Sequence, residues 1–154
     1  MMPPPLRATL RAVAVAMADV PDGWWIIGSA AVALHGGDAG RVRDVDLLVD
    51  ANIVGGLLSR LGIRPMAMAP DPLFHSAVFA RWDGLPLPVE VMAGFRVAVQ
   101  DAWRDVTLLS RRRIMVDGSA MFVPEREELL ELLRLFGRPK DLIRAEALAR
   151  REPG

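Results

Sequence analysis

The sequence predicts an α/β fold in which a mixed β-sheet is flanked by helices, and three observations lead to this prediction. Strand-like and helical segments alternate early in the chain, a hairpin signal lies in the middle, and two helices end it. A chain of 154 residues is long enough for one domain with its own core. We therefore expect a single domain over 1–154, with its core region over 24–123 and its C-terminal helices over 124–150.

The composition is that of a globular chain without a strong overall charge. Hydrophobic residues make up 52% and charged residues 25%, and 19 Lys and Arg balance 19 Asp and Glu. No global positive field therefore attracts nucleic acid or an anionic membrane. The lack of cysteine excludes disulfides and thiolate metal sites. Neither a signal peptide nor an apolar stretch of membrane-spanning length is evident, so we expect a soluble, cytoplasmic protein without membrane contact.

Turn and capping signals divide the first part of the chain into five segments. Pro21-Asp22-Gly23 marks a turn, and Gly36-Gly37 and Gly62 are helix-ending signals. Ser29 and Asp50 are good N-cap residues for the helices that follow them. We therefore expect a helix over 6–20, a strand over 24–27, a short helix over 30–35, a strand over 45–49 and a helix over 51–61.

The rest of the chain contains two hairpin signals and two helix starts. Asp83-Gly84 separates two strand-like segments, and Asp117-Gly118 is the expected turn of a second hairpin. Pro124 and Pro139 stand at the start of the last two helical segments. We expect strands over 74–82 and 87–92, a helix over 98–109, a hairpin over 113–123, and helices over 125–136 and 140–151.

Two carboxylates one residue apart stand out in an otherwise apolar strand, as Asp44-Val45-Asp46. Alternate residues of a strand share a face, so both side chains point the same way, with Cα atoms about 6.5–7 Å apart. Neighbouring carboxylates repel, and a divalent cation removes that repulsion. Oxygen ligands favour Mg²⁺ or Mn²⁺ over zinc. The plain alternative is an exposed strand end that carries two solubilising acids.

Two further features extend this pattern. Gly28-Ser29 lies at a strand-to-helix turn, where glycine lets a phosphate approach the backbone and the helix dipole favours an anion. Glu90 lies between two valines of a later strand. The alternatives are an ordinary β-to-α connection for the first feature and a surface-facing residue for the second. Together, three acids on two strands and a Gly-Ser turn suit two metal ions and a triphosphate, with in-line attack on the α-phosphate.

At these residues the chain resembles the DNA polymerase beta nucleotidyltransferase superfamily. The quoted segments are "GSAAVALHGGDAGRVRDVDLLVD" and, near the C-terminus, "LLRLFGRPKDLIRAEAL". The likeness covers residues 24–149 and is greatest to small bacterial members similar to nucleotidyltransferase toxins of abortive-infection and toxin–antitoxin systems. The resemblance implies the nucleotidyltransferase fold.

The resemblance also implies roles for single residues. Asp44, Asp46 and Glu90 would be the catalytic carboxylates and the ligands of Mg²⁺ or Mn²⁺, with Glu90 also helping to deprotonate the acceptor. Gly28 and Ser29 would contact the nucleotide phosphates. The remaining nucleotide-binding positions implied are Arg43 and, at the start of the last helix, Lys140 or Arg138 beside it, either of which would meet the triphosphate. The alternative for Lys140-Asp141 is an ordinary helix start with exposed charges.

The chain departs from the superfamily pattern in three places. Glu90 stands where many relatives have Asp, and the loop Arg41-Val42-Arg43 stands where they place Thr or Ser. A lysine of their penultimate helix is missing, and Arg134 is the nearby candidate to replace it, although arginine and lysine bind phosphate differently.

The expected function is Mg²⁺-dependent transfer of NMP from an NTP to an acceptor hydroxyl or phosphate. The acceptor is left open among tRNA, protein and small molecules, as are the NTP base and a partner protein or second copy of the chain. The alternative is a catalytically weak or inactive member that binds a partner protein in a toxin–antitoxin-like system. We expect structural roles for His35, His75 and the four tryptophans, and a solvated loop at Arg111-Arg112-Arg113.

Overall fold

Residues 2–151, which the computed structural model describes, form five helices and seven strands. The helices are α1 (Pro4–Ala16), α2 (Gly28–Leu34), α3 (Ala51–Leu61), α4 (Arg126–Phe136) and α5 (Pro139–Arg150). The strands are β1 (Trp24–Ile27), β2 (Val45–Val49), β3 (Phe74–Trp82), β4 (Val89–Val99), β5 (Ala102–Asp105), β6 (Arg112–Val116) and β7 (Ser119–Val123).

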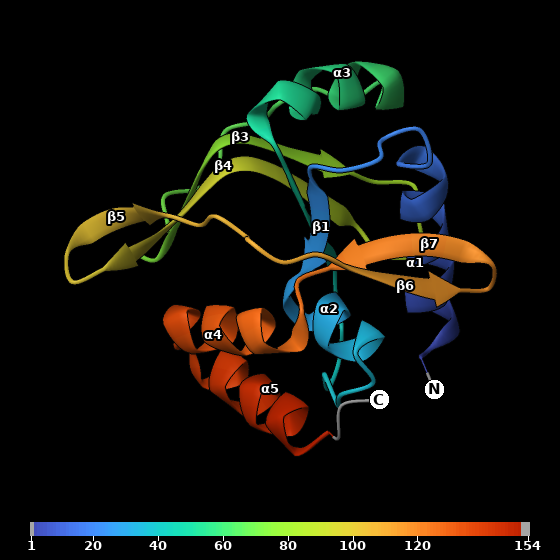
Figure 1. Cartoon of the computed structure of the whole chain (residues 1–154). Coiled ribbons are helices and arrows are strands. Elements are labelled where there is room, and N and C mark those ends of the chain that lie inside the picture. The colour runs from blue at the N-terminus through green and yellow to red at the C-terminus, as the bar shows by residue number, and fades with distance from the viewer. Residues whose placement is uncertain (1, 152–154) are drawn as a thin grey trace.

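A mixed sheet forms the centre of the fold (Figure 1). Four of its strands lie in the order β1-β2-β4-β3, and β5 pairs with the far part of β4. The β2–β4 pair is parallel, whereas the β1–β2, β3–β4 and β4–β5 pairs are antiparallel. β6 and β7 form a separate hairpin beside α1, and α4 and α5 pack together below the sheet (Figure 1). The predicted α/β class with a mixed sheet and C-terminal helices is thus confirmed.

Most predicted elements agree with the structure, with shifted ends. The strands over 24–27, 45–49 and 74–82, the helix over 51–61 and the hairpin turn at Asp117-Gly118 are confirmed. α1 begins and ends earlier than predicted, and β4 extends well beyond Met92 to Val99. Ser29 is not an N-cap, because α2 already begins at Gly28 and Ile27 occupies the cap position.

The predicted helix over 98–109 is wrong. This segment contains the end of β4, a tight turn and β5. Gln100 and Asp101 both have positive φ, at 50° and 65°, which is the backbone of a type I′ hairpin turn. The turn is two residues without glycine, so the usual sequence signal of such a hairpin is missing.

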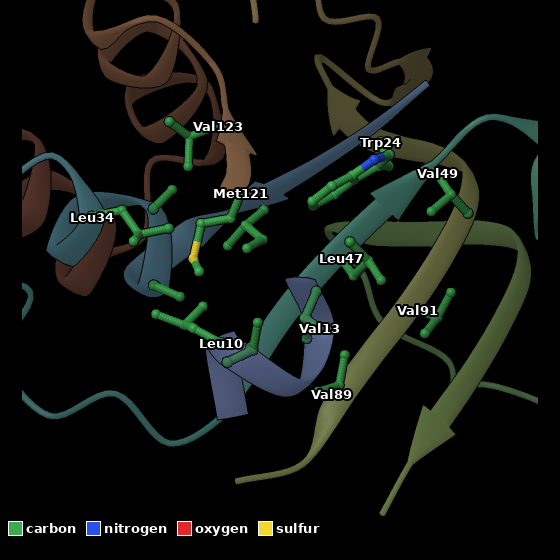
Figure 2. Packing of buried hydrophobic residues seen from close by; sticks show 14 of the residues in the cluster. Leu10, Val13, Trp24, Leu34, Leu47, Val49, Val89, Val91, Met121 and Val123 are labelled. Carbon is green, nitrogen blue, oxygen red and sulfur yellow. The ribbon is translucent and has the colours of Figure 1, made fainter. Parts of the chain in front are cut away.

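The two faces of the sheet pack against different elements. Trp24, Leu47 and Val91 point into the larger core, where they meet buried residues of α1, α3 and β7. Figure 2 shows this packing, with Leu10 and Val13 of α1 beside the strands. Alternate positions of the same strands face the other way, where Leu48 and Met92 pack with residues of α4. None of the helices in residues 2–151 has the length and apolar composition that a membrane crossing requires.

β4 reverses its inward-facing side at Gly94. Before this residue Met92 joins the smaller core and Ala93 the larger one, whereas after it Phe95 and Val97 join the smaller core. A regular strand would place Met92 and Phe95 on opposite faces. Gly94 has φ of +61°, and a Cβ at this position would lie 2.6 Å from the Cβ of Ala77 on β3. The left-handed glycine therefore lets both parts of β4 line one side of the sheet.

We expect Gly94→Ala to destabilise the protein by at least about 2 kcal/mol, because the new side chain combines a left-handed backbone with steric overlap. Urea denaturation measures this loss. Gly56→Ala is the matched control, because Gly56 lies in α3 with open space around it, and alanine there should stabilise by up to about 1 kcal/mol. Equal stabilities of Gly94→Ala and the unmodified protein would contradict the assigned role of Gly94.

Candidate functional site

Three carboxylates converge at one edge of the sheet. Asp46 is the second residue of β2 and Glu90 the second residue of β4, and the parallel register places them opposite each other. Asp44 directly precedes β2. One carboxylate oxygen from each of these half-buried residues lies within 4.8 Å of the other two. The alternative of separate exposed acids on unrelated strand ends is therefore wrong for this structure.

The turn after β1 brings its backbone against this cluster. Gly28 has φ of +67°, and a Cβ there would lie 2.8 Å from Oδ2 of Asp46. Only glycine fits this close approach without displacing the carboxylate. Ser29 follows in the first turn of α2, where backbone N–H groups have no partner within the helix, and its side chain is buried. The Gly-Ser turn and the carboxylates thus share one site.

A cleft of about 750 Å³ lies over the carboxylates. Its volume is within the range of small-molecule sites in proteins. The loop over 38–44 and one face of α5 contribute to its walls. The cleft is lined by the eight residues for which the resemblance implied catalytic, metal-binding or nucleotide-binding roles, namely Gly28, Ser29, Arg43, Asp44, Asp46, Glu90, Arg138 and Lys140.

The carboxylates perturb one another's ionisation. The pKa of Asp46 is raised to about 8, first by burial and then by the negative charges of Asp44 and Glu90, while Arg138 and Lys140 act in the opposite direction. The pKa of Glu90 is also raised, mainly by burial and then by Asp44, against Arg81 and a hydrogen bond with Asp46. In the metal-free protein the cluster therefore holds at least one proton at neutral pH.

This donor set fits a hard divalent cation. Three carboxylates supply oxygen ligands only, and their mutual repulsion is the charge imbalance that a cation would remove. Mg²⁺ and Mn²⁺ prefer such ligands, and no His or Cys lies in the cluster.

Arg138 is held in place by its neighbours in the cleft wall. Its guanidinium donates to both carboxylate oxygens of Asp141, at 2.6 Å and 3.0 Å, and lies 4.7 Å from the ring centroid of Phe74. Asp141 is only 2% exposed, so this pair fixes the start of α5 against β3. Lys140 is exposed at the same helix start.

The sequence prediction missed part of the charged lining. Ile143, Arg144, Ala147 and Arg150 line the cleft at spacings of three and four with the predicted Lys140, so one face of α5 forms this wall. A helical projection of the last segment would have identified Arg144, whose Nε donates to the carbonyl of Ala39 at 3.0 Å. Arg134, the candidate replacement for the missing lysine, is exposed on α4 and does not line the cleft.

The prediction also missed an apolar part of the lining. Met68 comes from the loop before β3, and further residues come from β3, β4 and the end of α4. The position of Phe95 was hidden from the sequence because β4 reverses its facing side at Gly94, and that of Met68 because it lies in a loop.

Two other residues noted in the sequence, His35 and Arg111, make structural contacts away from the cleft. Nε2 of His35 forms a hydrogen bond with the carbonyl of Pro124 at 2.8 Å. Arg111 lies 3.5 Å above the ring centroid of Phe122 and donates to the carbonyls of Trp24 and Pro21. The prediction of a solvated loop at Arg111-Arg112-Arg113 is thus wrong for Arg111, because its guanidinium stacks on the ring of Phe122. None of these residues lines the cleft.

Several solved nucleotidyltransferase structures resemble this fold. A candidate nucleotidyltransferase from Thermotoga maritima matches with a TM-score of 0.74 and 21% identity, over 97% of this chain and 94% of that chain. ANT(2″)-Ia, solved with adenylyl-2″-tobramycin, gives a TM-score of 0.57 and 16% identity over 93% and 87%. The lincosamide antibiotic adenylyltransferase LnuA, solved with lincomycin bound, gives 0.59 and 13% over 92% and 94%.

No protein-family model matches the chain, and no curated protein sequence matches it either. The structural likenesses show that the chain has the nucleotidyltransferase fold, which confirms the resemblance drawn from the sequence at the level of fold.

We expect the stability of the metal-free protein to fall as pH rises from about 4 to about 8. Asp46 keeps its proton in the folded state up to about pH 8, whereas it ionises near 3.8 when unfolded. The free energy of unfolding should therefore fall by up to about 1.4 kcal/mol per pH unit in this window and level off above it. Urea denaturation with a chelator present measures the slope.

Asp46→Asn should remove most of this slope and raise the stability at about pH 8, because asparagine carries no charge to bury. Asp105→Asn is the control, since Asp105 lies on exposed β5 in an ion pair with Arg96. An Asp46→Asn slope equal to that of the unmodified protein would show that Asp46 is not the group responsible.

Proposed function

We propose that this protein is a nucleotidyltransferase that moves NMP from an NTP to an acceptor hydroxyl or phosphate, with Mg²⁺ or Mn²⁺ as cofactor. The observation that carries the proposal is the convergence of Asp44, Asp46 and Glu90 beside the Gly28 turn on a nucleotidyltransferase fold. A fold alone does not define an activity, so the proposal depends on the site.

The reaction is a displacement at the α-phosphorus. The acceptor oxygen forms a bond to this atom, the bond to the oxygen bridging the α- and β-phosphates breaks, and pyrophosphate leaves. Glu90 takes the acceptor's proton, because its carboxylate lies in the cluster beside the reacting centre. Gly28 and Ser29 receive the outer phosphates at the start of α2.

Asp44, Asp46 and Glu90 hold the divalent cation in this proposal. When bound, Mg²⁺ supplies charge neutralisation to the triphosphate and to the reacting oxygens. Around this cluster the chain provides its own positive charge, with Arg43, Arg138 and Lys140 on the cleft wall. Their charge attracts the polyphosphate and stabilises the pyrophosphate as it leaves.

Similar structures bear on the acceptor class. ANT(2″)-Ia is seen with adenylyl-2″-tobramycin, and the lincosamide antibiotic adenylyltransferase LnuA is seen with lincomycin. A small-molecule acceptor is accordingly favoured among the acceptors that the sequence leaves open. The cleft volume supports the same choice.

Replacing both aspartates, as Asp44→Asn with Asp46→Asn, should lower Mg²⁺-dependent NTP turnover by at least about 10³-fold, because the cation loses two of its three carboxylates. Pyrophosphate release from radiolabelled NTPs measures the rate. The matched control is Asp105→Asn with Asp117→Asn, which changes two acids outside the cleft.

The unmodified protein must also bind an NTP in a Mg²⁺-dependent manner. Absence of such binding would contradict the proposal and favour the alternative, an inactive member that binds a partner protein. A partner complex that persists in the double asparagine variant would support that alternative.

Lys140→Met should raise the KM for the NTP about tenfold or more, with a smaller effect at high salt, because an exposed cation on the cleft wall is lost. Arg134→Met is the control, since Arg134 is an exposed cation outside the cleft. Steady-state kinetics at two salt concentrations measure both. A similar KM for the two variants would remove Lys140 from the proposed phosphate site.

A further inference from the structure

One end of the cleft is apolar. We call it the apolar wall, and its residues come from the loop before β3, from β3 and β4, and from the end of α4. They are Met68, Phe74, Phe79, Met92, Phe95 and Phe136.

The apolar wall has a packed base and an accessible surface. The rings of Phe74, Phe95 and Phe136 contact one another, with centroids 4.9 to 5.9 Å apart. Phe79 and Met68 are half-buried, although they line open volume. Apolar surface that faces a cleft gains free energy when a ligand covers it. Methionine adds an adaptable surface, because its side chain is unbranched and flexible.

The order of the strands places the apolar wall opposite the phosphate turn. Gly28-Ser29 follows β1 at one edge of the β1-β2-β4-β3 path, and Phe79 lies on β3 at the other edge. Asp46 and Glu90 lie on the two strands between them. In an in-line displacement the nucleophile enters opposite the leaving group. With pyrophosphate leaving beside Ser29, the acceptor enters from the side of Glu90 and β3.

The charges of the cleft are separated in the same direction. Its basic side chains come from the loop over 38–44 and from the start and face of α5, and the apolar wall contributes none. The acids of the lining are Asp38, the three clustered carboxylates and Asp141, which is buried and paired with Arg138. Arg138 lies 4.7 Å from the ring centroid of Phe74, but its guanidinium is paired with Asp141. The side chains of the apolar wall themselves offer neither a carboxylate to a polycationic acceptor nor a cation to an RNA backbone.

One polar group lies within the apolar region. Ser76 is 7% exposed and lies between Phe74 and Phe79 along β3, and its hydroxyl oxygen has no hydrogen-bond partner among residues 2–151. A buried polar group without a partner is costly. A rotation about χ1 would offer this hydroxyl to a polar group on a bound molecule.

We propose that the apolar wall is the acceptor subsite and that it takes a small, uncharged alcohol with a planar or otherwise apolar body. The proposal rests on the transferase function proposed above and selects one class among its open acceptors. The acceptor hydroxyl faces Glu90, its oxygen bonds to the α-phosphorus as pyrophosphate leaves, and its proton passes to Glu90. The product is a neutral body that carries one nucleotidyl ester.

The test uses methionine methyl groups as local reporters. NMR of protein labelled with ¹³C at its methionine methyls follows Met68 and Met92 in the apolar wall, with Met115 and Met121 outside the cleft as references. The probes are 1-naphthalenemethanol as the alcohol, and Mg²⁺ with α,β-methylene-ATP as a nucleotide that cannot react. The alcohol should shift the Met68 and Met92 signals with and without the nucleotide, and leave the references unchanged.

Two results would overturn the acceptor subsite. One is the lack of any shift at Met68 and Met92. The other is displacement of the alcohol by the nucleotide analogue, which would show that the apolar wall binds the nucleoside. Binding of the alcohol without any Mg²⁺-dependent nucleotide binding has a different meaning, because it leaves an apolar ligand site and refutes the transferase function.

Turnover provides the second measurement. With ATP and Mg²⁺, mass spectrometry should detect adenylylated naphthalenemethanol, and Phe79→Ala should raise the KM for the alcohol about tenfold while the KM for ATP stays within about twofold. Met115→Ala, an exposed apolar residue on β6, is the control and should change neither. Tobramycin is the polycationic comparison, and faster modification of tobramycin than of the alcohol would overturn the proposed acceptor class.

Discussion

The central physical constraint on this fold is that it holds three mutually repelling carboxylates close together. Asp44, Asp46 and Glu90 approach within 4.8 Å in a partly buried place, where like charges interact strongly. The parallel pairing of β2 with β4 holds them there, since it fixes Asp46 opposite Glu90. Apolar packing on both faces of the same strands opposes the repulsion. A proton held in the cluster at neutral pH relieves part of this repulsion, and a bound cation would relieve more of it.

The strand order converts this cluster into a directional site. A backbone turn suited to phosphate lies on one side of the carboxylates, and apolar side chains lie on the other. The basic residues come mostly from α5 and the loop over 38–44, and the bond from Arg144 to Ala39 ties these two segments together. One helix therefore both completes the cleft and holds the loop that precedes Asp44.

The sequence was informative where chemistry is local. Asp44 and Asp46 could be predicted as site residues because charged side chains are unusual in an apolar strand. Gly28 could be predicted because it lies between a strand and a helix. The convergence of the two aspartates with Glu90 was predicted from three acids on two strands and from the resemblance, and it is observed in the structure. The hairpin after β4 was predicted as a helix, because its turn residues Gln100 and Asp101 adopt positive φ without a glycine. Phe95 escaped prediction as a lining residue because alternation fails at Gly94, where β4 passes close to Ala77 of β3.

The reversal at Gly94 divides β4 into two stretches of opposite phase. In the first stretch even-numbered positions such as Glu90 face the cleft, and in the second Phe95 does so. Substitutions in the second stretch can reshape the apolar end of the cleft while Glu90 stays paired opposite Asp46. The two stretches of β4 can therefore be substituted separately, the first beside the carboxylates and the second at the apolar end of the cleft.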